Sequence, residues 1–163
     1  MSIGPGCYLE IIGPDPAQAP PVGPRWFGID ALSAPRLVAW AAAATDLPRL
    51  VNDAAERGVR LGAVGEGRRE RPDGVVLEWR VTDPTVVLGD GLVPFFIDWG
   101  ASPHPSSTAV VGPRLVALRG EHPDPGHVRT LLVALGVALP VDAAVRPSLV
   151  ATLETNAGLV QLR

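Results

Sequence analysis

One phrase occurs twice in this chain, and no other feature of the sequence constrains the fold as much. The residues PRLVAW occupy positions 35–40, and PRLVAL occupies positions 113–118. Each copy is followed by a turn and then by an apolar run with helical spacing. The run ends at Gly58 in the first copy and at Gly136 in the second. Recurrence of this kind indicates that one structural unit is present twice.

The first copy predicts a unit over residues 33–100. Its apolar run at 37–44 has the length of a strand, and Thr45 or Asp46 is a suitable N-cap for a helix that ends at Gly58. Three strand-like segments follow, around 64–67, at 75–82 and at 93–100, with a turn at 71–74. The predicted order is therefore strand, helix and three strands.

The second copy predicts a unit of the same order over residues 110–163. RLVALRG is read as a strand, DPGHVRTLLVALG as a helix, and LPVDAAV, RPSLVATLET and GLVQLR as three further strands. Neither unit alone could bury both its sheet face and its helix stripe. We therefore expect an α+β fold in a single domain over residues 1–163. In it, paired βαβββ units form a cupped, incompletely closed mixed sheet with the helices on the outer face.

A further strand-like segment, GCYLEIIG at residues 6–13, belongs to neither unit. It precedes PDPAQAPPVGP, a proline-rich stretch that must be an extended loop. An isolated strand needs partners for its backbone groups. We expect it to pair with the C-terminal unit, through GLVQLR or RLVALRG, and we expect a homodimer through whichever sheet edge remains.

Composition excludes several classes of protein. The chain has 163 residues, which suits one domain, and it has no run of about 18 apolar residues that could cross a membrane. Its net charge of −3, without a basic stripe, argues against a nucleic-acid partner. The single cysteine, Cys7, excludes an intrachain disulfide, and the chain has no lysine to form a Schiff base. The N-terminus lacks a secretory signal, so we expect a cytoplasmic protein.

Alternation along the strands assigns side chains to faces. In each strand one face is wholly apolar, and the other mixes large apolar groups with charge. We expect Trp79 and Trp99 to lie between sheet and helices, and the mixed face to line a concave ligand site. The charges assigned to that concave face are Glu10, Glu78, Arg80 and Asp98. The alternative is that Glu78 and Arg80 form ordinary pairs across strands on a wet sheet face.

The strings YLEIIGPDP, WFGID, RRERPDG, LVPFFIDWG, HPS and EHPDP occur in this order over residues 8–125. Together with paired βαβββ units, they resemble the glyoxalase-like branch of the vicinal oxygen chelate superfamily. The resemblance implies a cup-shaped sheet that binds a small molecule. Many relatives hold a divalent metal through His or Glu, and they include lyases and isomerases, whereas others bind drugs without chemistry.

The chain departs from this pattern in two ways. Members of the branch usually begin with a strand and helix that carry a DHL-like motif, and this chain starts after it, either as a natural short form or through a misplaced start. At positions where relatives commonly carry metal ligands, this sequence has Arg36, Arg114 and Gln161. Glu10 and Asp98 remain as oxygen ligands that could hold Mg²⁺ or Mn²⁺ together with waters, whereas a nearby arginine would favour an anion. The metal question stays open at this point.

The resemblance therefore implies a small-molecule protein. A carboxylate- or carbonyl-bearing ligand would be held by Arg80 with Arg36 or Arg114, and Glu10, Glu78 or Asp98 could act as a general base next to a carbonyl if burial raises its pKa. That chemistry would make the protein a lyase or an isomerase. Alternatives are a ligand-sequestering module without turnover and a truncated remnant. Further residues expected to contact the ligand are Trp40, Phe96 and His122.

Overall fold

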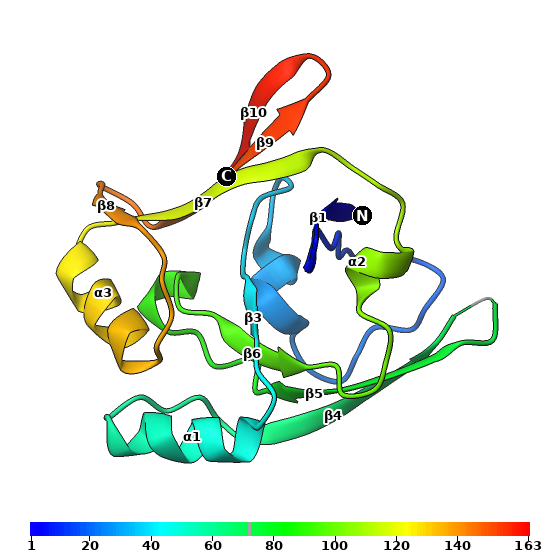
Figure 1. Ribbon diagram of the computed structural model, residues 1–163, viewed down its shortest axis with the longest axis horizontal. Helices are drawn as coiled ribbons and strands as arrows, with labels where there is room; N and C mark the ends of the chain where they lie inside the picture. The colour runs from blue at the N-terminus through cyan, green and yellow to red at the C-terminus, as the bar shows by residue number, and fades with distance from the viewer. Residues whose placement is uncertain (72) are drawn as a thin grey trace.

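The computed structural model describes residues 1–71 and 73–163 and shows an α+β protein (Figure 1). Within these residues the strands form one two-stranded sheet and two four-stranded sheets, and neither larger sheet closes on itself. Both larger sheets contain parallel and antiparallel pairs. The expected fold class is thereby confirmed. The predicted turn at 71–74 includes Pro72, which lies outside the described residues.

The first four-stranded sheet is built by the middle of the chain. Its order is β3-β6-β5-β4, with β3 and β6 parallel and the other neighbours antiparallel. Helix α1 follows β3 directly, and the short helix η2 (Gly89–Gly91) precedes β6. The elements are β3 (Ala41–Ala43), α1 (Leu47–Glu56), β4 (Val64–Glu70), β5 (Val76–Thr82) and β6 (Phe95–Asp98).

The second four-stranded sheet has the same elements in sequence but another strand order. After the short helix α2 (Pro105–Thr108), the chain forms β7 (Arg114–His122), α3 (Pro125–Ala134), β8 (Val141–Ala143), β9 (Ser148–Thr155) and β10 (Gly158–Leu162). The order is β10-β9-β7-β8, so the first strand of this unit lies between the second and the third. In the first unit the first strand pairs with the fourth. The repeated phrase therefore precedes β3 in the first copy and overlaps β7 in the second, and the two sheets are not identical.

The two helices begin and end in the same way. The Oδ1 atoms of Asp46 and Asp124 each accept the backbone N–H three residues later, at 3.2 and 3.0 Å. Gly58 and Gly136 end the helices with φ of 80° and 67°, a left-handed conformation that favours glycine. From 46 to 124 and from 58 to 136 the separation is the same 78 positions, which is also the separation between the two copies of the phrase. The spacing of the repeat is therefore the same from the phrase to the end of the helix, although β3 has three residues and β7 has nine.

Two clusters of buried apolar side chains hold these elements together. The first lies between α3 and the second sheet, and its members are Leu92, Val128, Leu132, Leu139, Val141 and Leu149. The second lies between α1 and the first sheet, and its members are Leu47, Ala54, Val59, Leu61 and Phe96. Leu131 of α3 and Leu135, the residue that follows the helix, also pack against the second cluster. Helix α3 therefore contacts both clusters and joins the two halves of the molecule.

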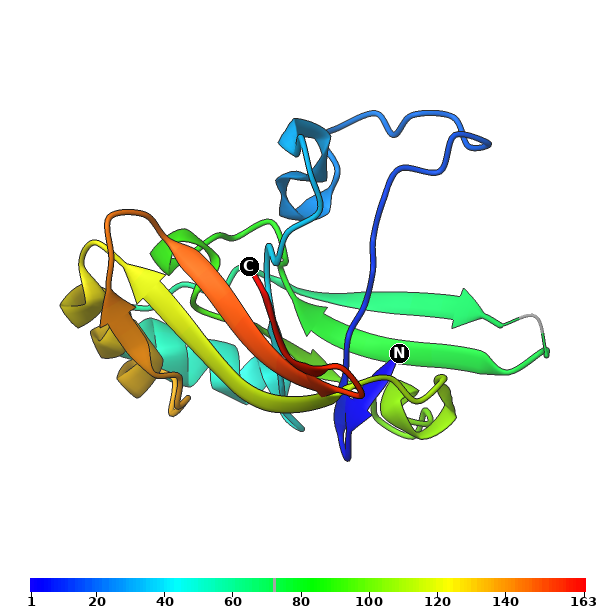
Figure 2. The ribbon, with the colours of Figure 1, turned by 90° about the horizontal axis from the view of Figure 1, so that it is seen from above.

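The N-terminal segment forms its own small hairpin instead of the strand predicted at 6–13. Only β2 (Cys7–Tyr8) is strand there, and it pairs with β1 (Ser2–Gly4). Ser2 also forms a bridge with Val111, but β2 pairs with no strand of the C-terminal unit. Closing a hairpin across two intervening residues costs less chain entropy than pairing across the whole domain. The proline-rich loop then runs away from the sheets before η1 (Trp26–Ala31), as Figure 2 shows.

The assignment of faces on the first sheet is the reverse of the expected one. Helix α1 packs on the face that carries Phe96, the face that Asp98 shares by alternation. Trp79 and Trp99 lie on the opposite face, where Trp99 packs against Tyr8 of the N-terminal hairpin and against His104 beside α2. Alternation shows which side chains share a face, but both faces here carry large apolar groups. Which one the helix covers depends on the handedness of the connection from β3 to β6, and that requires the strand order.

Among the residues that the structure describes, no helix is long and apolar enough to cross a membrane.

Candidate functional site

Three of the predicted site residues lie together on the helix-bearing face of the first sheet, beyond the area that α1 covers. Strands β4 and β5 pair so that Glu66 stands opposite Arg80 and Arg68 stands opposite Glu78. Arg80 also stands opposite Asp98 of β6. These five side chains form what we call the charged groove. The structure thus brings Glu78, Arg80 and Asp98 together on one face of the sheet.

The charges of the groove form a ladder across the three strands. The Arg80 Nη2 atom donates to Oδ2 of Asp98 at 2.8 Å, and Nε of Arg68 lies 3.6 Å from Oε1 of Glu78. Cross-strand pairs of this kind are what the alternative hypothesis from the sequence predicted. The Arg68–Glu78 pair is largely exposed, so it stabilises the fold by less than about 1 kcal/mol. The stability that such pairs add to the fold is therefore too small to account for five charged side chains in this area.

A loop after β6 closes one side of the groove. Strand β6 pairs with β5 at only two positions, which leaves the backbone of Glu78 without a strand partner on that side. The Ser102 hydroxyl takes its place, because Oγ accepts the Glu78 N–H and donates to the Glu78 carbonyl, both at 2.8 Å. Residues 99–103 are thereby held beside β5. Together with the strands they line an open hollow of about 640 Å³.

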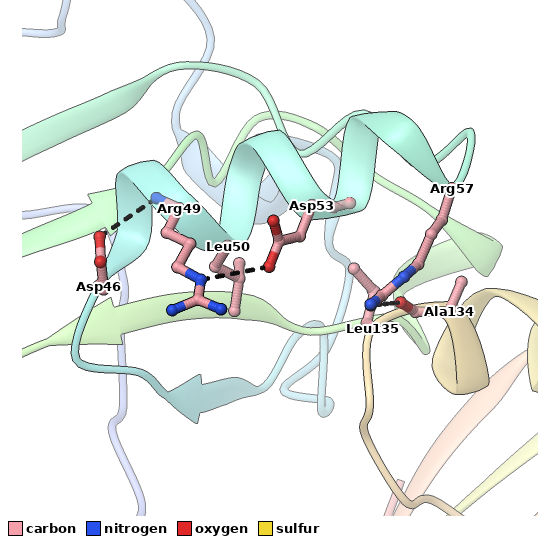
Figure 3. A pocket seen from close by; sticks show the side chains of 8 residues that line it. Asp46, Arg49, Leu50, Asp53, Arg57, Ala134 and Leu135 are labelled. Carbon is pink, nitrogen blue, oxygen red and sulfur yellow. Dashed lines mark hydrogen bonds and ion pairs between the residues drawn. The ribbon is translucent and has the colours of Figure 1, made fainter.

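The volume of this hollow falls within the range of about 300–1,000 Å³ that small-molecule sites usually have. A second hollow, of about 240 Å³, lies between α1 and the end of α3 (Figure 3). There Arg57 donates to the Ala134 carbonyl at 2.9 Å and ties the two helices together. Arg49 and Asp53 lie along the same helix, 3.6 Å apart. Because this second hollow is smaller than most ligand sites, the charged groove is the better candidate.

The electrostatics of the groove centre on Asp98. The backbone N–H of Gly100, at 2.9 Å, and the guanidinium of Arg80 hold the pKa of this carboxyl below its ordinary value of 3.8. The Asp98 side chain is 11% exposed, whereas that of Arg80 is 44% exposed. Arg80 therefore presents donors to solvent that Asp98 does not use. Asp98 itself is a stable anion and a weak proton acceptor.

The opposite face of the sheet carries a cluster of aromatic side chains: Tyr8, Trp79, Trp99 and His104. The rings of Trp79 and Trp99 lie 5.2 Å apart between centroids, and Tyr8 packs edge-on against Trp99 and His104. The Nε1 of Trp99 is buried and has no hydrogen-bond partner among the described residues. Burial, with the nearby carboxylate of Glu10, raises the pKa of Tyr8 to about 12. The N-terminal hairpin is held in place by this cluster.

The remaining charged residues predicted for the site do not lie in the groove. Glu10 is exposed after β2 and acts electrostatically on Tyr8, which belongs to the other face. Arg36 is exposed before β3. Arg114, at the start of β7, forms an ion pair with Glu154 at 2.7 Å. Arg80 thus has no second arginine from the predicted set beside it.

The three other residues predicted to contact ligand belong to the packed interior. Trp40 packs against the α3 cluster, and its Nε1 donates to the Leu92 carbonyl at 2.9 Å. Phe96 is 2% exposed and lies beneath α1. His122 is 7% exposed, with both ring nitrogens engaged. None of the three lines either hollow, so we leave them out of the proposed site.

Three residues were not predicted from the sequence for this site: Glu66 and Arg68 of the groove, and Ser102 beside it. A signal for two of them was present, because alternate positions of VGEGRRE carry Glu66 and Arg68 on one face. Pairing them with Glu78 and Arg80 requires the register of the hairpin, which the turn around residues 71–74 determines. No local sequence pattern points to Ser102, because its hydrogen bonds to the Glu78 backbone depend on where β6 ends.

The residues of this chain do not fit a divalent metal of the kind that many relatives hold. Within residues 1–71 and 73–163, no three side chains of His, Cys, Asp or Glu lie close enough together to hold a metal ion. Asp98 is bound to the cationic Arg80, which opposes a second cation. Glu10 belongs to another part of the molecule. We therefore derive no step through a metal.

Comparison with known proteins identifies the family. The mixed sheets and strand–helix repeats are those expected of a glyoxalase-like protein, and the family model of the glyoxalase-like domain matches residues 1–136. Because this is well over half of the chain, the protein belongs to the glyoxalase-like domain family of the vicinal oxygen chelate superfamily. The match confirms the resemblance seen in the sequence, and it ends before β8, β9 and β10. No curated protein and no solved structure matches the chain.

Proposed function

We propose that the protein binds a small zwitterionic molecule in the charged groove and does not transform it. The observation that carries this proposal is the gathering of two guanidiniums and three carboxylates on one face of a hollow of ligand size. With carboxylates in excess, a simple anion is not the best ligand. A molecule with both charges would place its carboxylate near Arg80 and its cationic group near Glu66 and Glu78. A reducing, cytoplasmic environment, which suits the free Cys7, is part of this proposal.

We infer that the ligand is not transformed because the carboxyl groups of Glu78 and Asp98 are paired with arginines and are poorly suited to act as general bases. A general base for proton abstraction next to a carbonyl works best when its pKa lies near the working pH. The pKa of Asp98 is instead lowered by the Gly100 N–H and by Arg80. Glu78 is exposed, and its side chain pairs with Arg68. Among the functions that the family resemblance implies, these residues therefore best support ligand sequestration without turnover.

The proposal is tested with three probes of similar size: 4-aminobutyrate, butyrate and butylammonium. Amide NMR spectra of the full chain would be recorded during titration with each probe at low salt. Because the groove is open to water, we expect a dissociation constant of about 1 mM, or about −4 kcal/mol, for the zwitterion. The amides of β5 and residues 99–103 should shift with 4-aminobutyrate and respond less to the single-charge probes.

Two outcomes would contradict the proposal. Shifts confined to another surface, or no saturable shift with any of the three probes, would show that the groove is not a zwitterion site. Turnover of a carbonyl-bearing ligand, abolished by Glu78→Gln, would replace sequestration by the lyase or isomerase hypothesis.

A further inference from the structure

Strand β10 (Gly158–Leu162) is an open edge of the second sheet. It pairs with β9 at five consecutive positions without a shift in register. On its other side, no strand of the described residues pairs with it. A neighbouring backbone bond lies beyond the strand, where the Arg163 carbonyl accepts the N–H of Leu37 at 2.9 Å. The outer backbone groups of residues 158–162 are therefore available to another strand.

This edge lacks the devices that usually prevent strand pairing. Protected edges carry charges, proline or bulges. The long edge strand of the first sheet, β4, is protected in this way, with charged side chains at Glu66, Arg68, Arg69 and Glu70. Strand β10 has the sequence GLVQL, with no charge and no proline. Two copies of β10 can therefore approach each other without electrostatic repulsion.

Apolar side chains on both faces of β10 remain exposed. Leu159 is 67% exposed and Val160 is 43% exposed. Consecutive strand residues point to opposite faces, so a neighbouring strand would cover apolar surface on each face of the sheet. An added strand would thus satisfy backbone groups and bury side chains at the same time.

We propose that β10 pairs antiparallel with β10 of a second copy of this chain, which forms a two-fold symmetric dimer with one continuous eight-stranded sheet. Using all five residues requires the symmetry axis to pass at Val160. Val160 then stands opposite the partner's Val160, and Leu159 opposite the partner's Gln161. The pairing is self-complementary, as an isologous interface must be.

The other sheet edges explain why pairing would stop at two copies. The opposite edge of the second sheet is β8, with three residues, and the edges of the first sheet are β3, with three residues, and the charged β4. Once two copies join through β10, no long uncharged edge remains in the four-stranded sheets. A closed dimer is therefore the expected product, and a fibre is not.

Disulfide trapping tests the proposed register directly. In a Cys7→Ser background, Val160→Cys should give a disulfide-linked dimer under mild oxidation, because directly opposed Cβ atoms lie about 5 Å apart. The matched control is Val133→Cys on α3, where the side chain is 78% exposed, and it should give little or no linked dimer. Equal trapping at both positions would contradict the proposal.

Sedimentation equilibrium tests the dimer itself. The full-length chain should be a dimer, and either Val160→Lys or Leu159→Lys should convert it to a monomer with an unchanged circular dichroism spectrum. Val133→Lys should leave the dimer intact. A monomeric parent chain, or a dimer that survives both lysine variants, would overturn the proposal. A strand from another protein would then be the better occupant of this edge.

Discussion

The Nε2 atom of His122 lies 2.8 Å from Oδ2 of Asp90. The other ring nitrogen, Nδ1, accepts the backbone N–H of Asp124 at 2.9 Å. Because Nδ1 is an acceptor, the proton of the neutral ring is on Nε2, which donates it to the carboxylate. Asp90 itself has φ of 53°, an uncommon value for a residue other than glycine. The ring is therefore a buried link between the loop at η2 and the N-terminus of α3.

This position predicts a structural role for His122. His122→Ala leaves both polar partners without the ring and opens space in a buried region, so the free energy of unfolding should fall by about 2–3 kcal/mol. The exposed His127, near the start of α3, is the control, and His127→Ala should change stability by less than about 0.5 kcal/mol. Urea denaturation measures both. Normal stability of His122→Ala with weakened probe binding would instead restore His122 to the ligand site.

The two helix caps should be equivalent in energy. Asp46→Ala and Asp124→Ala each remove one side-chain acceptor for the N–H three residues later, and each should lower the free energy of unfolding by about 1 kcal/mol. Thermal or urea unfolding of both variants checks this. A large loss of unfolding free energy for one variant and none for the other would show that the two caps, although alike in geometry, do not stabilise their helices equally.

The ring of Trp79 lies directly over Gly67 on the neighbouring strand. A Cβ at Gly67 would overlap this ring, whereas a Cβ at Gly65 would meet no atom within 4 Å. Gly67→Ala should therefore lower the free energy of unfolding by about 1–3 kcal/mol, and Gly65→Ala should have little effect. In a Trp79→Ala background the cost of Gly67→Ala should largely disappear. Additive costs in this double-mutant cycle would show that the ring is not what excludes the methyl group.

Acid sensitivity should depend on Asp98. Its pKa in the folded protein lies below the ordinary 3.8, chiefly through the Gly100 N–H and then through Arg80. A lowered pKa means stabilisation that is present above the ordinary pKa and is lost as the pH falls through the native value. The difference in free energy of unfolding between the parent and Asp98→Asn should thus be greatest near neutral pH and shrink in acid. A difference that grows on acidification would contradict this sign.

Local signals in the sequence predicted much of the fold. Aspartate caps and terminal glycines act within one turn of a helix, so Asp46, Gly58, Asp124 and Gly136 were sufficient to place α1 and α3. The strands at 75–82 and 114–120 were also evident from their apolar alternation. The structure adds the lengths of the short strands, such as β3, which covers only three of the eight residues predicted.

The site was less predictable because it depends on relations between strands. Glu78, Arg80 and Asp98 were recognised as sharing a face, and the structure brings them together. Which face α1 covers could not be decided from alternation, since Phe96 and Trp79 are both large and apolar. Arg36 and Arg114 were expected beside the ligand because relatives commonly carry site residues there. In this chain their places in space are set by strand orders that differ between the two units.

The most direct test of the account compares two arginines that the sequence proposed for the same role. Arg80 lines the charged groove, whereas Arg114 lies on β7 against Glu154. Each is exposed, so Arg80→Gln and Arg114→Gln should both fold with nearly unchanged stability. Titration of 4-aminobutyrate into each variant, followed by amide NMR, should show at least about tenfold weaker binding for Arg80→Gln, or about 1.4 kcal/mol, and unchanged binding for Arg114→Gln. Unchanged binding by Arg80→Gln, or an equal loss in both variants, would contradict the assignment of the ligand site to the groove.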